Sequence, residues 1–495
     1  MKEIKVVCNS KFQIGRIDNR IYGSFAEHMG RVVYGGIYDK GNPLSDDRGF
    51  RQDVIDAIKG AGITQVRYPG GNFVSNYIWE DGVGPVEKRP SRLDLAWKAL
   101  ETNEFGTDEF MQWTEQAGVS PILAVNLGTR GITDAVNYLE YCNLDTESKY
   151  SRLRKENGHD KPYGVKVWCL GNEMDGEWQI GHKTANEYGR LAAETSKAMK
   201  IADPSIETVI CGSSLISMPT FPSWEATVLD ETYDFVDYIS LHQYFGGQEK
   251  GTEEFLNQAD DMLEYIDTVQ AVIQYVKAKK RSSHKVRISI DEWGVWTHKS
   301  SETDKEAESN RWAVSPAISE MIYSFEDTLL FAEMLMTMIK KCDVVSMACQ
   351  SLIANISSMI MVDKDGIWYQ PIYYPFSYMA RFALGKALQV VFDDAEKMLD
   401  IISVYNESDG ELVIFAVNRN ESQGISVAFD AQGYRMENVV EHIAMTCDDK
   451  SATNYDIHDR IRPVEADGHS LEKDRLIIDM PSLSWSMIRV KAGVV

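Results

Sequence analysis

Eight short apolar segments recur between residues 21 and 349, and their repetition constrains the fold more than any other feature of the sequence. These strand-like segments are Ile21–Phe25, Ile63–Tyr68, Pro121–Leu127, Val165–Leu170, Thr208–Cys211, Tyr238–His242, Val286–Ile290 and Val344–Cys349. Helical patterns separate most of them, at Asp53–Ala61, Arg92–Ala117 (two helices), Asp134–Tyr141, Ala185–Ile201, Glu254–Lys279 and Glu320–Lys341. Strands that alternate with helices form parallel sheets, so the pattern predicts an α/β fold. Eight strands favour a closed (β/α)8 TIM barrel. An open doubly wound sheet is the alternative, since the number of strands does not establish closure.

The pattern changes from residue 386 onward, where short alternating segments are separated by Asp, Gly, Asn and Ser turns. These segments are Leu399–Tyr405, Leu412–Val417, Ile425–Phe429, Val439–Met445, Leu476–Met480 and Ser484–Val490. Such spacing is typical of an antiparallel β-sandwich, jelly-roll-like in kind. Strand-like residues near the N-terminus could cover an open edge of that sandwich. We therefore expect residues 1–16 to join the sandwich, residues 17–385 to form the catalytic barrel, and residues 386–495 to form the sandwich domain.

Composition and charge exclude several classes of partner. The 495 residues include 51 basic and 75 acidic side chains, which give a formal net charge of −24 and a pI of about 4.9. This charge repels nucleic acid and anionic membranes, and no apolar run reaches the ~18 residues of a membrane span. The seven cysteines are scattered without zinc-type spacing, and no nucleotide-binding motif occurs, so we expect no metal and no cofactor. The start of the sequence does not resemble a signal peptide, which predicts a cytoplasmic protein.

Two of the predicted strands end in a glutamate. Glu173 follows the fourth strand (VKVWCLGNEMDG), and Glu292 follows the seventh (VRISIDEW). The carboxyl ends of barrel strands carry the active site, and the fourth and seventh strands lie nearly opposite each other. A lone glutamate at a strand end more often forms a salt bridge or caps a helix. A facing pair suits glycoside hydrolysis, in which one carboxyl group protonates the leaving oxygen and the other attacks the anomeric carbon.

Other polar and aromatic residues occur at the same ends of the predicted strands. In chain order the polar residues are Glu27, His28, Arg67, Asn72, Asn126, Asn172, His242, Gln243 and Tyr244. Amide and carboxylate groups bind hydroxyls through directed hydrogen bonds. Trp97, Trp178, Trp293 and Trp296 offer flat apolar faces for a sugar ring, although core packing explains any one of them equally well. Their convergence on one end of the barrel predicts a carbohydrate site.

Seven blocks of this sequence resemble the α-L-arabinofuranosidases of glycoside hydrolase family 51. The blocks are IYGSFAEHMGRVVYGGIYD, VRYPGGNFVSNYIWEDGVGP, RLDLAWKALETNEFGTDEF, WCLGNEMDGEWQIGHKTANEYGR, CGSSLISMPTFPSWE, YISLHQY and DEWGVW. The resemblance covers nearly the whole chain. It implies a barrel with a C-terminal β-sandwich and a retaining, exo-acting, cofactor-free enzyme. The implied substrates are arabino- and arabinoxylo-oligosaccharides with terminal non-reducing α-L-arabinofuranosyl residues. The implied assembly is a cytoplasmic homo-oligomer, often a hexamer.

The resemblance also implies a role for individual residues. Glu173, in GNEMDG, stands where the family has its acid/base catalyst, and Glu292, in DEW, where it has its nucleophile. Glu27, Asn72 and Asn172 match family positions that bind the furanose hydroxyls. We therefore expect these five side chains to surround the bound sugar.

Five further residues match positions around the reacting groups. Tyr244 matches the tyrosine beside the nucleophile, and Arg67 and His242 match the polar groups that support the two carboxylates. Trp97 and Trp296 match the aromatic walls of the substrate-binding cleft. The resemblance thus implies a complete set of substrate-binding and supporting residues.

One segment departs from the family pattern. After the eighth predicted strand the family commonly has a glutamine that reaches the sugar, in an AQLVN-like run. This chain has Leu352 at the matching place in SLIAN, and Gln350 lies two residues earlier. Gln350 is therefore the candidate replacement, and the preferred substrate depends on whether it reaches the sugar.

Two other functions are compatible with the same residues. A β-xylosidase or an endo-β-glucanase would keep both glutamates and change the side chains around them. A non-catalytic sugar-binding scaffold is expected to lack one catalytic carboxylate, whereas both are present here.

Overall fold

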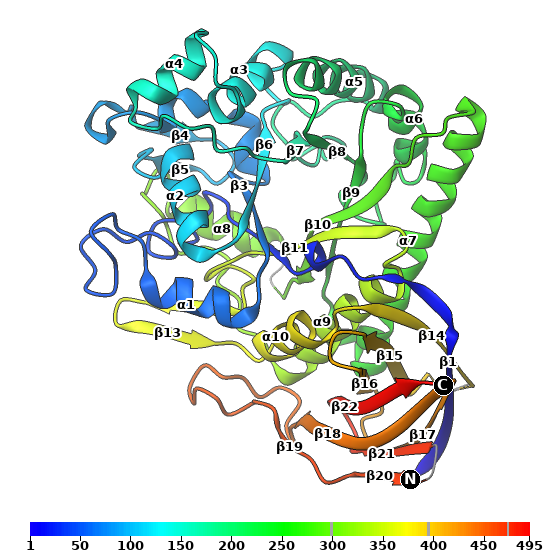
Figure 1. Cartoon of the computed structure of the whole chain (residues 1–495). Coiled ribbons are helices and arrows are strands. Elements are labelled where there is room, and N and C mark those ends of the chain that lie inside the picture. Colours follow the sequence, from blue (N-terminus) through cyan, green and yellow to red (C-terminus); the bar gives the residue numbers. More distant parts are fainter. Residues whose placement is uncertain (298–299, 394–396, 473–474) are drawn as a thin grey trace.

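The computed structural model describes residues 1–297, 300–393, 397–472 and 475–495. The chain forms a barrel surrounded by helices, and a large sheet lies against one side of it (Figure 1). Two short hairpins, β4–β5 and β12–β13, are added to these parts. Among the described residues no helix is both long enough and apolar enough to cross a membrane.

Eight strands close into the barrel in the order β10-β11-β2-β3-β6-β7-β8-β9. They are β2 (Gly23–Phe25), β3 (Gln65–Tyr68), β6 (Ser120–Val125), β7 (Val167–Leu170), β8 (Glu207–Cys211), β9 (Tyr238–Phe245), β10 (Arg287–Val295) and β11 (Val345–Ser351). All eight neighbouring pairs are parallel, including the pair β11–β2 that closes the ring. Each strand overlaps one of the eight predicted segments. The closed barrel is therefore confirmed, and the open sheet is excluded.

Five helices lie close to their predicted positions. They are α1 (Gln52–Ala61), α3 (Ile132–Asn143), α5 (Ala185–Ala202), α7 (Thr252–Lys280) and α9 (Phe325–Lys340). Helix α5 begins with a capping box, in which Thr184 and Glu187 each accept a hydrogen bond from the other's backbone N–H. Four further helices were outside the predicted segments: α4 (Lys149–Glu156), α6 (Ser223–Thr232), α8 (Ser300–Ser309) and α10 (Tyr373–Phe382).

The prediction of two helices over Arg92–Ala117 is wrong in its first half. Residues there form the hairpin β4 (Arg92–Asp94) and β5 (Ala99–Glu101), and only α2 (Thr107–Ala117) is helical. The buried carboxylate of Asp94 accepts hydrogen bonds from the backbone N–H groups of Ala96 and Trp97. Because a side chain that binds nearby backbone competes with helix formation, Asp94 fixes a turn at this position.

Ten strands form the second sheet, in the order β19-β18-β22-β16-β15-β14-β1-β17-β21-β20. They are β1 (Lys2–Arg16), β14 (Lys386–Phe392), β15 (Leu399–Asn406), β16 (Glu411–Asn418), β17 (Ile425–Gln432), β18 (Tyr434–Thr446), β19 (Val464–Glu465), β20 (His469–Glu472), β21 (Arg475–Met480) and β22 (Ser484–Val494). The N-terminal strand β1 lies between β14 and β17. Its pairing with β17 is parallel, so the sheet is mostly rather than wholly antiparallel.

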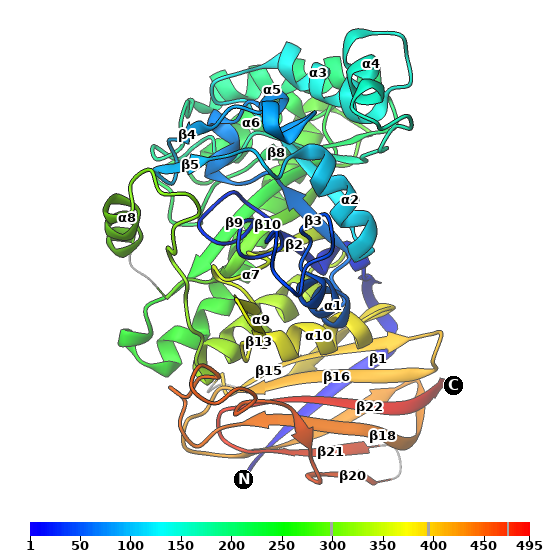
Figure 2. The same cartoon turned by 90° about the vertical axis from the view of Figure 1, so that its left-hand side faces the viewer.

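Alternate residues of β16 belong to two different cores. Leu412 and Ile414 pack into an apolar core within the sheet, whereas Val413 and Phe415 join the large core of the barrel. Helices α9 and α10 lie between barrel and sheet (Figure 2), and α9 is buried from Phe325 to Ile339. Because α9 has neighbours on every side, even its acidic residues Glu326, Asp327 and Glu333 are buried.

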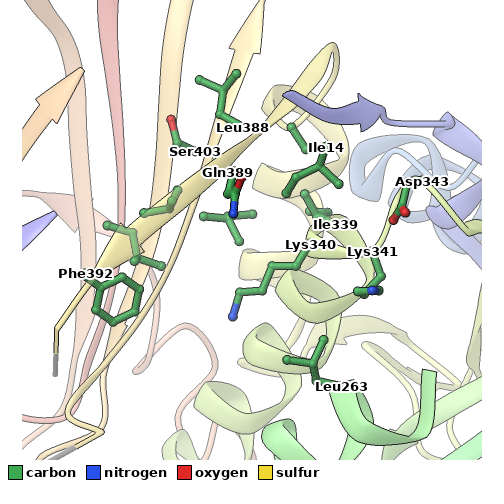
Figure 3. Close-up of a pocket in the computed structure, with 14 residues that line it drawn as sticks. Ile14, Leu263, Ile339, Lys340, Lys341, Asp343, Leu388, Gln389, Phe392 and Ser403 are labelled. Carbon is green, nitrogen blue, oxygen red and sulfur yellow. The ribbon is translucent and has the colours of Figure 1, made fainter. Parts of the chain in front are cut away.

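A cavity of about 450 Å³ lies where α9 meets β14 and β15. Figure 3 shows Lys340, Lys341 and Asp343 on one side of it and Leu388 and Phe392 on the other. Asp343 precedes β11, so this cavity is near the amino ends of the barrel strands. It therefore lies away from the strand ends that carry Glu173 and Glu292.

Candidate active site

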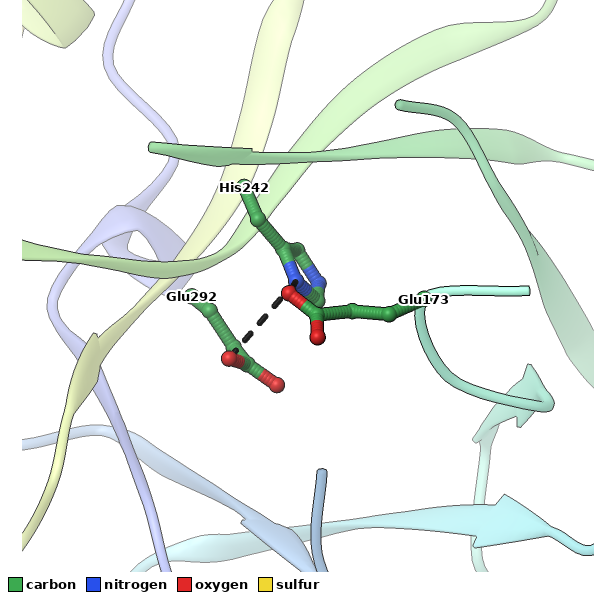
Figure 4. A group of neighbouring side chains, drawn as sticks. All are labelled: Glu173, His242 and Glu292. Carbon is green, nitrogen blue, oxygen red and sulfur yellow. Dashed lines mark hydrogen bonds and ion pairs between the residues drawn. The ribbon is translucent and has the colours of Figure 1, made fainter. Parts of the chain in front are cut away.

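The barrel brings Glu173, His242 and Glu292 together from the loop after β7 and from the strands β9 and β10 (Figure 4). Glu173 follows β7, and His242 is the fifth of the eight residues of β9. Glu292 lies within β10 rather than after it, because that strand continues to Val295. One carboxylate oxygen from each glutamate and a ring nitrogen of His242 all lie within 4.8 Å of one another. The predicted facing pair of glutamates is thus present in the fold.

Glu292 is held by donors from two neighbouring elements. Arg67 Nη1, from β3, donates to Glu292 Oε1 at 2.8 Å, and the Tyr244 hydroxyl donates to Oε2 at 2.8 Å. The side chain of Arg67 is 1% exposed and that of Glu292 is 8% exposed, so this ion pair is shielded from water. The charge of Arg67 stabilises the negative charge of Glu292, and the two donors fix the orientation of its carboxylate.

Glu173 has a different environment. Its Oε1 lies 3.0 Å from His242 Nδ1, and its Oε2 accepts a hydrogen bond of 2.6 Å from Trp178 Nε1. Burial raises the pKa of Glu173, and the charge of Glu292 raises it further, whereas the hydrogen bond from His242 opposes the rise. A carboxyl group with a raised pKa is suited to donate a proton near neutral pH. The backbone φ of Glu173 is +44°, in the left-handed region, and a turn begins at this residue, since Gly176 N–H donates to its backbone carbonyl at 2.9 Å.

His242 is held between carboxylates on both ring nitrogens. Its Nε2 lies 3.0 Å from Asp291 Oδ1, and its Nδ1 also lies 3.6 Å from Glu292 Oε2. Burial would lower the pKa of His242, but the nearby charges of Glu292, Asp291 and Glu173 outweigh it and hold the pKa well above its ordinary value. Asp291 was not among the predicted site residues. Its signal in the sequence was a charged residue inside an otherwise apolar strand.

The same three groups could be considered as metal ligands. Glu173, His242 and Glu292 form the one such group found among the described residues. Arg67 already places a fixed positive charge 2.8 Å from Glu292. A second cation beside it would be repelled, so the arrangement is better suited to proton transfer and nucleophilic attack.

Glu27 lies after β2 and is 3% exposed. Its Oε1 accepts hydrogen bonds from the backbone N–H of Phe73 at 2.9 Å and from Trp97 Nε1 at 3.0 Å. Burial, with a smaller effect of the Glu292 charge, raises the pKa of Glu27 to about 8. The Gly70-Gly71 pair makes room for this carboxylate, because a Cβ on Gly71 would lie 2.7 Å from Glu27 Oε2. These glycines are therefore packing positions for Glu27.

Asn172 is buried between two side chains. Its Oδ1 accepts from Arg67 Nη2 at 2.6 Å, and its Nδ2 lies 3.4 Å from Gln179 Oε1. Arg67 thus contacts both Asn172 and Glu292. Asn72 is half-buried at the start of a 3-10 turn after β3. Its backbone carbonyl oxygen lies 3.4 Å from Gln179 Nε2. Gln179 therefore links both asparagines, a contact that sequence reasoning missed.

The end of β11 supplies a serine. Ser351 Oγ lies 2.7 Å from the Tyr244 hydroxyl, which in turn donates to Glu292. Gln350 is fully buried and donates from Nε2 to the carbonyl of Ser357 at 2.7 Å. Leu352 is also buried. Ser351, rather than Gln350, is therefore the polar side chain of this segment that reaches the catalytic pair.

The aromatic residues divide into two groups. Trp296 is half-buried and makes an edge contact with Tyr244, and Trp97 is bonded to Glu27. Trp178 is 49% exposed beside Glu173. Trp293, in contrast, is fully buried and packs on Phe331 of α9, so it is a core residue.

His28 is a structural residue despite its place beside Glu27. Its Nδ1 pairs with Glu101 Oε2 at 2.8 Å, and its Nε2 lies 2.8 Å from the Tyr68 hydroxyl. Glu101 belongs to the hairpin β4–β5, which also carries Trp97. The buried pair therefore attaches this hairpin to the barrel. Asn126 is likewise occupied, because its side chain bonds the loop residues after β6.

A (β/α)8 barrel with two facing carboxylates at the carboxyl ends of its strands defines the class of glycoside hydrolases. Comparison with known proteins gives the family. Residues 57–258 match the model of the "Alpha-L-arabinofuranosidase 1 domain", and residues 291–484 match that of the "Alpha-L-arabinofuranosidase C-terminal domain". The chain belongs to the α-L-arabinofuranosidases of glycoside hydrolase family 51.

Three individual proteins illustrate the similarity. An intracellular exo-α-(1→5)-L-arabinofuranosidase of Acetivibrio thermocellus is 47% identical over 99% of this chain and 100% of its own length. An exo-α-(1→6)-L-arabinofuranosidase of Bifidobacterium longum is 40% identical over 99% of this chain and 98% of its own. The structure of a family 51 α-L-arabinofuranosidase from Bifidobacterium longum superposes with a TM-score of 0.93, at 35% identity, over 99% of this chain and 100% of that one.

Proposed function

We propose that this chain releases terminal non-reducing α-L-arabinofuranosyl residues by hydrolysis, with retention of anomeric configuration. The observation that carries the proposal is the spacing of the two glutamates, whose nearest carboxylate oxygens lie within 4.8 Å of each other. Retaining glycosidases have carboxyl groups about 5–5.5 Å apart, whereas inverting enzymes need about 6.5–9.5 Å to admit a water. The spacing in this chain supports direct attack by one of the two carboxylates.

Glu292 is the proposed nucleophile and Glu173 the proposed acid/base. Arg67 and Tyr244 orient Glu292, which attacks the anomeric carbon. Glu173, whose pKa is raised, gives its proton to the leaving oxygen as the bond between carbon and oxygen breaks. The sugar is then an ester of Glu292. In the second step Glu173 accepts a proton from water, and the oxygen of that water displaces the ester to regenerate Glu292.

The remaining site residues are proposed to bind the sugar. Glu27, Asn72 and Asn172 would contact its hydroxyls, Trp97 and Trp296 would form the apolar walls, and His242, with Arg67, would support the carboxylates. The bonds from Phe73 and Trp97 that fix Glu27 support the first of these roles. A binding group that is oriented before the substrate arrives loses less entropy when it binds.

The proposed substrates are arabino- and arabinoxylo-oligosaccharides, such as fragments of arabinan and arabinoxylan. Relatives at 47% and 40% identity differ in the linkage that their names give, 1→5 in one and 1→6 in the other. Family membership therefore does not fix the linkage. Relative rates on oligosaccharides with α-1,2, α-1,3, α-1,5 and α-1,6 bonds measure it.

The organisation of the chain belongs to the same proposal. We assign residues 17–385 to the catalytic barrel and residues 1–16 with 386–495 to the sheet domain, a division supported by the position of β1 between β14 and β17. Cytoplasmic location is supported by the relative that is named intracellular and by seven free cysteines, six of them buried. A homo-oligomer, hexameric by family resemblance, is testable by light scattering.

Nitrophenyl glycosides test the activity directly. The purified chain should hydrolyse the α-L-arabinofuranoside, and faster hydrolysis of the β-xyloside or of internal bonds in β-glucan would assign it to another retaining class. Proton NMR of the first product should show the α-anomer; initial release of the β-anomer contradicts retention.

Two variants test the roles of the glutamates. Glu292→Ala should have no measurable turnover on any substrate. Glu173→Ala should lose about 10²- to 10⁴-fold on oligosaccharides but much less on dinitrophenyl arabinofuranoside, whose leaving group needs little protonation. Equal losses on both substrates would show that Glu173 is not the acid.

A further inference from the structure

Asp291 is a buried carboxylate that the proposed mechanism does not use. It is 2% exposed, and it contacts His242 Nε2 at 3.0 Å, Arg67 Nε at 3.6 Å and Cys169 Sγ at 3.6 Å. None of these contacts reaches the anomeric carbon directly. Asp291 nevertheless lies one residue from the proposed nucleophile and one imidazole ring from the proposed acid/base.

We propose that Asp291 is a positioning residue that keeps His242 protonated on both nitrogens and so confines the transferable proton of Glu173 to Oε2. This inference rests on the proposed function, because it assigns a task within the same reaction. It goes beyond that function by naming the group that determines which oxygen of the acid/base catalyst acts.

The imidazole ring of His242 makes one hydrogen bond through each of its nitrogens. An ionised carboxylate has only acceptors, so Asp291 fixes a proton on His242 Nε2. If Nδ1 had no proton, it would accept one from Glu173 Oε1 at 3.0 Å, and the catalytic proton would be held in that bond. With a proton on Nδ1, the imidazolium donates to Oε1 instead. The acidic proton of Glu173 is then left on Oε2.

The charges around His242 favour the doubly protonated form. The ring contacts Glu173, from the loop after β7, and Asp291 and Glu292, from β10. Asp175, from the same loop as Glu173, interacts with the ring electrostatically and instead accepts a hydrogen bond from Ser214 N at 3.1 Å. Arg67 pairs with Asp291 and Glu292. The thiols of Cys169, Cys211 and Cys349 lie near Asp291. Of the three carboxylates that contact the ring, Arg67 balances one and an imidazolium balances a second, which leaves Glu173 as the group that carries a neutralising proton.

This arrangement also keeps the net charge of the cluster constant during the reaction. In the first step the electron pair of the breaking bond and the proton of Glu173 both go to the leaving oxygen. Glu292 loses its negative charge on forming the ester, and Glu173 gains one. The imidazolium is already bonded to Glu173 Oε1 when that charge appears, so no group needs to reorganise.

Asp291→Asn tests the proposal, with Asp108→Asn as a matched control. The amide introduced by Asp291→Asn keeps an acceptor for Nε2–H but removes the charge. Asp108 is another buried aspartate, bonded by Tyr141 and Tyr163. In wild type the ¹⁵N shifts of His242, assigned with His242→Gln, should be those of imidazolium at pH 7. In Asp291→Asn they should be those of a neutral ring.

Activity provides a second readout. The Asp291→Asn variant should lose at least tenfold more kcat/KM on arabino-oligosaccharides than on dinitrophenyl arabinofuranoside. The basic limb of its pH profile should move to lower pH by about one unit or more, because removal of the negative charge of Asp291 lowers the pKa of His242, and the imidazolium then loses its proton at lower pH. Asp108→Asn should leave the ratio of the two substrates and the pH limb unchanged.

Two results would overturn the inference. A neutral His242 in wild type at pH 7 does so without any variant, even if Asp291→Asn fails to fold. Unchanged ring shifts and an unmoved pH limb in folded Asp291→Asn do so as well, since a loss of rate alone would then be structural. Failure of the proposed function is distinguishable, because it would appear as wild type that does not hydrolyse arabinofuranosides.

Discussion

The carboxyl group of Glu27 packs directly against the backbone of Gly71. The Gly71 position is so close that an added Cβ would lie 2.7 Å from Glu27 Oε2. We expect Gly71→Ala to displace this carboxyl group and to raise KM about tenfold or more, since a buried polar group left without its partner costs about 1–3 kcal/mol. Michaelis kinetics on nitrophenyl arabinofuranoside measure the effect. An unchanged KM with an unchanged melting temperature would show that Glu27 does not contact the sugar.

The raised pKa of Glu27 predicts a pH dependence of stability. Its ordinary value is 4.5, and burial raises it to about 8 in the fold. The folded chain therefore holds this proton more tightly than the unfolded chain does. The stability that the proton contributes is fully present below pH 4.5 and is lost as the pH rises toward 8.

Glu27→Gln removes this titration while preserving the shape of the side chain. Urea unfolding at pH 5, 6.5 and 8 should show a smaller decrease in the free energy of unfolding for the variant than for wild type. Other titrating groups contribute equally to both proteins, so their contribution cancels in the difference between the two free energies of unfolding. Parallel curves would mean that Glu27 is ionised throughout this range.

Residues that could be predicted from the sequence share one property, a polar side chain where an apolar strand ends. Glu173, His242 and Arg67 were found in this way. Asp291 lies beside a second acidic residue, Glu292, and only the fold shows that its carboxylate contacts His242. Trp293 alternates with Glu292 along β10 and so packs outward on α9. Gln350 and Ser351 likewise lie on opposite sides of β11. Ser351 therefore contacts Tyr244, whereas Gln350 bonds the backbone of Ser357.

At the level of elements, the hairpin β4–β5 positions Trp97 and is attached to the barrel through Glu101. Glu101 accepts hydrogen bonds from the Tyr34 hydroxyl at 2.5 Å and from Asn103 N at 2.6 Å, besides its pair with His28. In Glu101→Gln the new amide would face His28 Nδ1, donor against donor. We expect a loss of about 1–3 kcal/mol in the attachment of the hairpin.

Hydrogen exchange and kinetics together measure this effect. Amides of β5 should exchange faster in Glu101→Gln, and KM should rise because Trp97 and Glu27 are less well held. Glu308→Gln is the control, since Glu308 contacts the same hairpin. Glu308 pairs with Lys98 at 3.1 Å but is 54% exposed, so its loss should change little. Equal effects of the two variants would remove Glu101 from this role.

The hairpin β4–β5, which replaces a predicted helix, has a physical explanation. Barrel strands and helices such as α5 follow local patterns of apolar spacing and capping. The hairpin at Arg92–Glu101 depends on a buried aspartate that binds its own turn, and Trp97 then bonds to Glu27, 70 residues earlier. Tertiary contacts of that kind override local helix propensity.

At the scale of the whole molecule, barrel and sheet are joined by a shared core and by strand β1. Residues Val413 and Phe415 of β16 belong to the barrel core, and β1 connects the start of the chain to the C-terminal strands. The sequence predicted that the first 16 residues join the sheet, but not that they lie in its middle. The parallel pairing of β1 with β17 is not dictated by any hairpin, so no local signal could specify it.

A buried ion pair bridges the two parts and gives the last prediction. Arg419, after β16, donates from Nε to Glu333 Oε1 of α9 at 2.6 Å, and Glu333 is fully buried. Burial raises the pKa of Glu333 to about 8, against the opposing charge of Arg419. Removing one partner of a buried pair costs about 3–5 kcal/mol, whereas replacing both by apolar groups is often nearly neutral.

We therefore expect Arg419→Met to lower the free energy of unfolding by several kcal/mol at pH 8 and by less at pH 6, where Glu333 becomes protonated in the folded chain. The double variant Arg419→Met/Glu333→Met should recover part of the loss and should no longer show the pH dependence that Glu333 causes. The remaining loss reflects Asp260 and Asp400, which lie 3.5 Å and 3.8 Å from Arg419 Nη2. Because α9 packs on both parts, thermal unfolding followed by calorimetry should remain a single transition in all three proteins. Two separated transitions in Arg419→Met would show instead that the sheet unfolds independently of the barrel, and that the pair contributes to docking rather than to a common core.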